Sequence, residues 1–262
     1  MMVTAGVDLA SQAFHTAACV IEWYGGHATV TKLAVDVQDS AIAELISRAD
    51  KVGIDIPLGW PMAFVDAVSL HSRNGSWPLN YSHADNSAYR YRRTDLAVRK
   101  MLKISPLSVS CDRIAIPAMR AAALLSKLPH RPPLDGSGVV VEVYPAVALA
   151  RWEFTSRLYK RSENMESRQL LVESLMREGA DWLIIPKADV NRCLSSDDAL
   201  DAIVAALVAR AAGMKLVEAI PENERAAALH EGWIAVPKPG TFARLPLEVL
   251  EPPGDRGLPR YS

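Results

Sequence analysis

The sequence has few cysteines and no apolar run long enough to span a bilayer. Its three cysteines, Cys19, Cys111 and Cys193, are widely separated and form no C-x-x-C pair, which disfavours a disulfide framework or a zinc site and favours a reducing compartment. The longest apolar stretches, 139–150 and 202–209, are too short for a transmembrane helix, and the first residues lack the charged and apolar regions of a secretion signal. We therefore expect a soluble, cytoplasmic protein that does not enter membranes.

The sequence also lacks an excess of charge of either sign. A net charge of −1 argues against a protein that coats nucleic acid through bulk electrostatics. Locally, however, a basic segment with interleaved tyrosines runs from Tyr89 to Lys103. This segment is either a solvated helix face or a phosphate-binding surface, and the sequence favours the two about equally.

Several well-known catalytic motifs are missing as well. The six histidines are scattered without metal-ligand spacing, and there is neither a G-x-x-x-x-G-K phosphate loop nor a G-x-S-x-G nucleophile elbow. The chemistry must therefore be sought among the acidic residues.

Half of the 262 residues are apolar, which is enough for one large domain or for one domain with an insertion. The first sixty residues show the pattern strand, strand, strand, helix, strand, and a helix that precedes the last strand implies a parallel crossover. We expect these elements at 4–9, 16–23, 28–37, 40–49 and 51–58.

The next eighty residues, 59–138, differ in composition, and we expect them to form a helical and loop insertion within a single domain of residues 1–250. Residues 71–86 are polar and predict a long loop, whereas 251–262 predict an irregular tail. Further helices are expected at 94–103, 117–128, 168–178 and 198–212, and further strands at 139–143 and 232–236.

Asp8 and Asp55 lie toward the ends of two predicted strands, and each follows a glycine by two residues, Gly6 and Gly53. Side chains two positions apart share a face of a strand, so both aspartates have small neighbours. If the strands are adjacent and parallel, their spacing of about 4.8 Å brings both carboxylates within reach of one ion, for which the small neighbours leave room. A turn or cap is the commoner role for a single such aspartate, so the prediction depends on the pair.

Asp197, Asp198 and Asp201 open a late helix whose continuation, 202–208, is apolar on all sides and is therefore expected to be buried. Helix capping and the helix dipole explain Asp197 and Asp198 as well as a ligand role does. Asp201 directly precedes the buried stretch and is the preferred ligand. Glu142 interrupts a valine-rich strand, where it forms either an ion pair or a metal contact.

Taken together, these residues resemble the predicted RNase H-like nucleases classified as domain of unknown function 429. The resemblance implies an α/β fold of the RNase H type, in which helices flank a five-stranded mixed sheet of order 3-2-1-4-5. The order of the acidic motifs is also similar to that of Holliday-junction resolvases. The segments that carry the resemblance are 6–8, 53–59, 93–99, 142–145, Lys160 and 198–202.

The resemblance further implies a hydrolase that cleaves DNA or RNA, and we expect two Mg²⁺ (or Mn²⁺) ions to assist it. The catalytic residues would be Asp8, Asp55 and Asp201. The metal ligands would be these three with Asp198 and Glu142, and Arg93, Arg99 and Lys160 would bind the phosphate.

Two alternatives stay open. One is phosphoryl transfer from ATP, as in actin-like proteins and sugar kinases, although the chain shows neither their internal duplication nor a glycine-rich phosphate loop. The other is a non-catalytic module that binds nucleic acid or a protein through residues 89–103.

Overall fold

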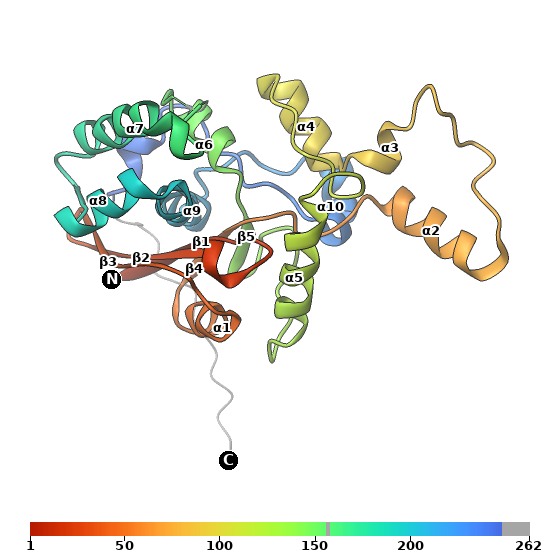
Figure 1. The fold of residues 1–262 in the computed structure, drawn as a ribbon, viewed down its shortest axis with the longest axis horizontal. Coiled ribbons are helices and arrows are strands. Elements are labelled where there is room, and N and C mark those ends of the chain that lie inside the picture. Colours follow the sequence, from red (N-terminus) through yellow and green to blue (C-terminus); the bar gives the residue numbers. More distant parts are fainter. Residues whose placement is uncertain (156–157, 248–262) are drawn as a thin grey trace, which may run out of the picture.

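A mixed sheet of six strands lies at the centre of the computed structural model, which describes residues 1–155 and 158–247 (Figure 1). The predicted tail, 251–262, lies outside these residues. The strand order is β5-β4-β1-β2-β3-β6. The strands are β1 (Met2–Asp8), β2 (Ala17–Tyr24), β3 (His27–Val35), β4 (Lys51–Asp55), β5 (Val140–Glu142) and β6 (Leu183–Ile184).

The first five strands keep the predicted order, and β4 lies parallel to β1 as the crossover through the helix α1 (Asp39–Arg48) requires. The expected number of five strands is wrong, because β6 adds a sixth strand parallel to β3 through Leu183 and Ile184. The strand predicted at 232–236 does not form either. Instead, Ile234 makes an isolated parallel bridge to Glu142 at the end of β5.

Helices cover both faces of the sheet (Figure 1). One apolar cluster joins the strands to α1 and α5 (Ala115–Ser126) on one face. On the opposite face lie α6 (Pro145–Arg151), α7 (Met165–Glu178), α8 (Lys187–Ser195) and α9 (Asp197–Gly213).

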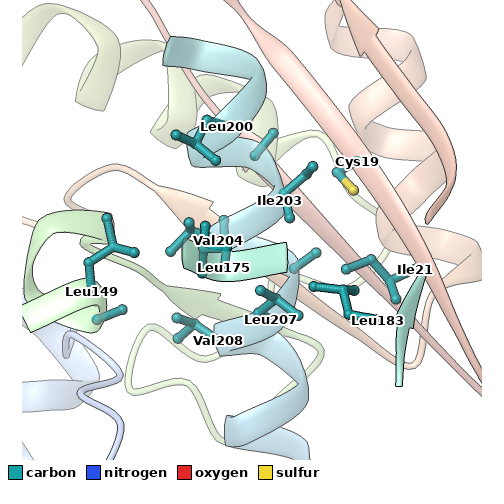
Figure 2. Packing of buried hydrophobic residues seen from close by; sticks show 14 of the residues in the cluster. Cys19, Ile21, Leu149, Leu175, Leu183, Leu200, Ile203, Val204, Leu207 and Val208 are labelled. Atoms are coloured by element: carbon teal, nitrogen blue, oxygen red, sulfur yellow. The ribbon is translucent and has the colours of Figure 1, made fainter. Parts of the chain in front are cut away.

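The α9 helix forms the centre of the larger apolar cluster (Figure 2). Residues 199–211 of this helix are all buried, which confirms the burial expected from its apolar sequence. Figure 2 shows Ile203 and Leu207 of α9 together with Cys19 and Ile21 of β2. The helix that carries Asp201 is therefore fixed in the core over residues 199–211.

The segment between β4 and β5 forms a helical extension beside the sheet (Figure 1). It contains α2 (Met62–Asn74), α3 (Ser87–Arg90), α4 (Arg93–Leu102) and α5, and α10 (Arg225–Glu231) packs against α2 and α4 from later in the chain. The predicted loop begins only at Gly75, because α2 continues to Asn74 and Gly75 ends it in the left-handed conformation at φ 74°. Single 3₁₀ turns occur at Ala13–His15, Ser162–Asn164, Glu222–Glu224 and Phe242–Arg244.

Within residues 1–155 and 158–247, none of the helices combines the length and the apolar character that crossing a membrane demands.

Candidate metal centre

Three aspartates from three elements converge at the carboxyl ends of β1 and β4. Asp8 and Asp55 are direct partners in the parallel register of these strands, and Asp201 approaches from α9. One carboxylate oxygen of each residue lies within 4.8 Å of the others. The structure therefore brings together the three residues that the sequence predicts as catalytic.

The close approach of α9 depends on Gly6 and Gly53. A Cβ atom on Gly6 would lie 2.0 Å from the carbonyl oxygen of Ala202, and one on Gly53 would lie 2.3 Å from that of Ala205. The expectation that these glycines leave room for an ion is thus wrong, because the helix backbone fills the space. Their role is to let Asp201 reach the two strand aspartates.

Lys160 and Tyr159 supply the partners of Asp201. The Nζ atom of Lys160 lies 2.6 Å from Asp201 Oδ2 and 4.0 Å from Asp55 Oδ2. The Tyr159 hydroxyl donates a hydrogen bond of 2.8 Å to Asp201 Oδ1. Both oxygens of the fully buried Asp201 therefore face a donor or a cation.

Arg168 positions the segment that carries Tyr159 and Lys160. The guanidinium group of Arg168 is buried and donates hydrogen bonds to the backbone carbonyls of Tyr159 at 2.9 Å and Arg161 at 3.0 Å. Its other nitrogens bind the carbonyl of Leu194. The position of Lys160 is consequently tied to α7 and α8.

The crowded carboxylates disfavour one another's ionisation. Burial, together with the charges of Asp55 and Asp201, raises the pKa of Asp8 well above its usual range. Burial also raises the pKa of Asp55 to about 7, against the opposing effect of Lys160. The pKa of Asp201 is likewise raised by burial, although Lys160 and Tyr159 oppose the shift.

This donor set fits a divalent cation. Three ionised carboxylates beside one ammonium group would leave two negative charges uncompensated in a buried site, and carboxylate oxygens are the ligands that Mg²⁺ and Mn²⁺ prefer. Asp8 has no hydrogen bond to its carboxylate within the described chain, so its oxygens are available as ligands.

Asp198 lies outside this cluster. It is half-buried in the first turn of α9, and burial and the charge of Asp197 raise its pKa. Ser196 is the N-cap of α9, and its hydroxyl accepts a hydrogen bond from the backbone N–H of Ala199. The aspartates that the sequence offered as caps therefore follow the cap, where the helix dipole favours negative charge.

Glu142 forms the ion pair that the sequence left as an alternative to ligation. Arg92 donates to both of its oxygens, at 2.6 and 2.7 Å, and the backbone N–H of Leu58 donates at 3.0 Å. Arg92 also binds both oxygens of Asp95, and all three charged side chains are buried. This network ties the loop after β4 to α4 and leaves Glu142 little capacity to hold a metal.

Arg93 and Arg99 are exposed on α4, and within the described residues neither pairs with the three clustered aspartates. The guanidinium group of Arg93 lies 3.8 Å from Glu224, and its backbone N–H donates a hydrogen bond of 2.7 Å to Glu231. Of the predicted phosphate-binding residues, the structure thus places only Lys160 at the acidic cluster.

A cavity of about 390 Å³ opens beside the acidic cluster. Asp55 and Lys160 line it on one side. Its remaining walls come from Ile56, Pro57, Arg92, Pro106, Leu107, Ile114, Glu142, Val143, Tyr144, Ala146, Leu158, Tyr159 and Ile234.

Four residues at or beside the site were not among the predicted site residues: Arg92, Tyr144, Tyr159 and Arg168. Tyr144 directly follows the valine-rich strand that carries Glu142, and Tyr159 adjoins Lys160. Both tyrosines could have been found in the sequence as neighbours of these predicted site residues. Nothing in the local sequence separates the buried Arg92 from its exposed neighbour Arg93.

Comparison with known proteins identifies one family. The family model described as "Protein of unknown function (DUF429)" matches residues 6–226, a span that contains the three aspartates and Lys160. No curated protein and no solved structure matches the chain.

Proposed function

The chain belongs to the DUF429 family of proteins of unknown function, and we propose that it hydrolyses phosphodiester bonds of a nucleic acid on an RNase H-like core with divalent metal ions. The observation that carries this proposal is the convergence of Asp8, Asp55 and Asp201 within 4.8 Å. Parallel strands and a buried helix hold these carboxylates, so the site is organised before a cation binds.

Asp8 and Asp55 would hold one Mg²⁺ or Mn²⁺ ion, and Asp8 and Asp201 would hold a second, whereas Asp198 lies outside this ligand set. When bound, such ions neutralise phosphate charge and make a water molecule a stronger nucleophile. Glu142 is left out of this ligand set because Arg92 and the N–H of Leu58 occupy its oxygens.

Lys160 has two roles in this proposal. In the absence of substrate, its ammonium group offsets part of the charge of Asp201, at 2.6 Å. With substrate bound, it exchanges this contact for a phosphate oxygen and opposes the negative charge that develops during cleavage. Tyr159 keeps Asp201 oriented while Lys160 moves.

The proposed setting is the cytoplasm. All three cysteines are free, and two of them are buried, which suits a reducing compartment.

The test combines metal binding with cleavage. Calorimetric titration with Mn²⁺ should show binding that Asp8→Asn and Asp201→Asn abolish or strongly weaken. A panel of branched, duplex and single-stranded DNA and RNA should then be cleaved in Mg²⁺ by the wild type and not by these variants.

The matched control is Asp181→Asn, which makes the same change at an exposed position after α7. This variant should bind Mn²⁺ and cleave as the wild type does. Cleavage that survives both substitutions in the cluster would refute the proposed mechanism. Strand binding without turnover in Mg²⁺ would support the non-catalytic alternative instead.

A further inference from the structure

Of the three clustered aspartates, Asp55 alone lines the cavity beside them, and the walls of this cavity differ in chemistry from the cluster. The charged groups Asp55 and Lys160 lie on one side, whereas Leu107, Ile114 and Leu158 contribute accessible apolar surface. A ligand that fills this space must therefore combine an apolar body with an anionic group.

The charged groups Arg92 and Glu142 in the cavity wall offer little hydrogen bonding to a ligand, whereas Tyr144 offers one free donor. Arg92 and Glu142 line the cavity, but their polar atoms bind each other. Tyr144 is half-buried and its hydroxyl has no hydrogen-bond partner in the described chain, and burial and the charge of Asp55 raise its pKa. Tyr144 is therefore a free donor between the apolar wall and the acidic cluster.

The size of the cavity limits the occupant. A volume of about 390 Å³ equals that of a sphere roughly 9 Å across, which falls at the small end of ligand pockets. A double helix is wider than its own major groove, which is roughly 12 Å across in the B form. The cavity is narrower than this groove, so it cannot surround a duplex. It suits a single ring system joined to one phosphate.

We propose that this cavity holds the base of one unpaired nucleotide whose phosphate lies at the acidic cluster, so that the substrate is single-stranded or contains an extruded nucleotide. This inference rests on the proposed nuclease function. The half-buried Tyr144 supplies aromatic surface for the base. Recognition tolerates different bases, because stacking rather than paired hydrogen bonds carries it.

The binding test uses two strands that differ only in their bases. The first is a fluorescein-labelled oligothymidine, and the second is a strand of equal length in which every base is replaced by an abasic residue. Both carry the same phosphates, so anisotropy titrations in Ca²⁺, chosen to limit turnover, isolate the contribution of the bases. We expect the full-length protein to bind the abasic strand about tenfold more weakly than the oligothymidine. A duplex of the same sequence should bind no more tightly than the abasic strand.

Two variants connect this discrimination to the cavity. Ala146→Phe places a ring in the cavity, and Leu107→Trp narrows it from an exposed position. Each variant should bind the oligothymidine and the abasic strand with nearly equal affinity. The matched control is Leu170→Trp, which lies exposed on α7 outside the cavity and should keep the tenfold difference. The midpoint of thermal unfolding of each variant shows whether the variant is folded. If Ala146→Phe does not fold, Leu107→Trp alone tests the cavity.

The outcomes separate this inference from the function on which it rests. If the wild type did not bind Mn²⁺, or if Asp8→Asn bound it equally well, the metal site and both proposals would be refuted. Normal Mn²⁺ binding with equal affinity for the two strands would overturn the base-binding cavity alone. If thymidine monophosphate bound as tightly as the oligothymidine, the cavity would serve a free nucleotide and the assignment to a strand would fall.

Discussion

Replacement of Asp55 by asparagine should stabilise the metal-free protein at neutral and alkaline pH. The pKa of Asp55 is about 7 in the folded protein, against an ordinary value of 3.8. A carboxyl group whose pKa is raised by folding favours the folded state fully below its ordinary pKa, and this contribution is lost as the pH rises through the folded value. Ionisation of Asp55 between about pH 4 and 7 therefore destabilises the wild type.

The magnitude follows from the difference between the ordinary pKa of 3.8 and the folded pKa of about 7. At 1.36 kcal/mol per unit, the cost reaches at most about 4 kcal/mol above pH 7. Asparagine has a similar shape and does not ionise. The Asp55→Asn variant should thus match the wild type near pH 4 and exceed it by a few kcal/mol at pH 8.

Urea denaturation in a chelator at half-unit steps from pH 4.5 to 8.5 measures this difference. The exposed Asp181→Asn control should follow the wild type at every pH. At pH 8, Mn²⁺ should stabilise the wild type more than Asp55→Asn. The cation offsets the negative charge of the clustered carboxylates, and the variant has one carboxylate fewer. A stability difference that is the same at every pH would refute this account of the cluster.

Three further substitutions test separate parts of the structure. Gly6→Ala should lower the free energy of unfolding by several kcal/mol, since its Cβ would lie 2.0 Å from the Ala202 carbonyl oxygen; a loss below about 1 kcal/mol in urea would contradict this packing. Arg92→Met should cost about 3–5 kcal/mol in the same assay, because it leaves buried carboxylates unpaired, and a neutral result would contradict the network. Lys160→Met should tighten Mn²⁺ binding several-fold by calorimetry, because the ammonium no longer competes for Asp201, whereas unchanged affinity would show that the two do not compete.

The pairing of Asp8 with Asp55 was predictable because it depends on local patterns. Strand periodicity assigns each aspartate to a face, and the helix between the third and fourth strands requires a parallel crossover. The register Asp8↔Asp55 then follows because each aspartate stands four residues after the first residue of its predicted strand, and Thr4 pairs with Lys51. The expected ligand role of Asp201 was harder to derive, because it depends on where a distant helix packs.

The burial of Arg92 was not predictable from its surroundings. It stands within a run of arginines, and its main partner, Glu142, is fifty residues away. Strand β6 was missed for a similar reason, because its two residues acquire strand geometry only beside β3. In both cases tertiary contacts determine the conformation and the local sequence carries no distinctive signal.

The packing of α9 on the sheet links the stability of this protein to its proposed chemistry. Gly6 and Gly53 admit the helix backbone so closely that Asp201 reaches the strand aspartates. The same packing buries most of α9 in the apolar core, and that burial offsets the cost of holding three carboxylates together. A larger residue at either glycine would therefore weaken the core and separate the acids in one step, so substitutions there cannot affect stability alone.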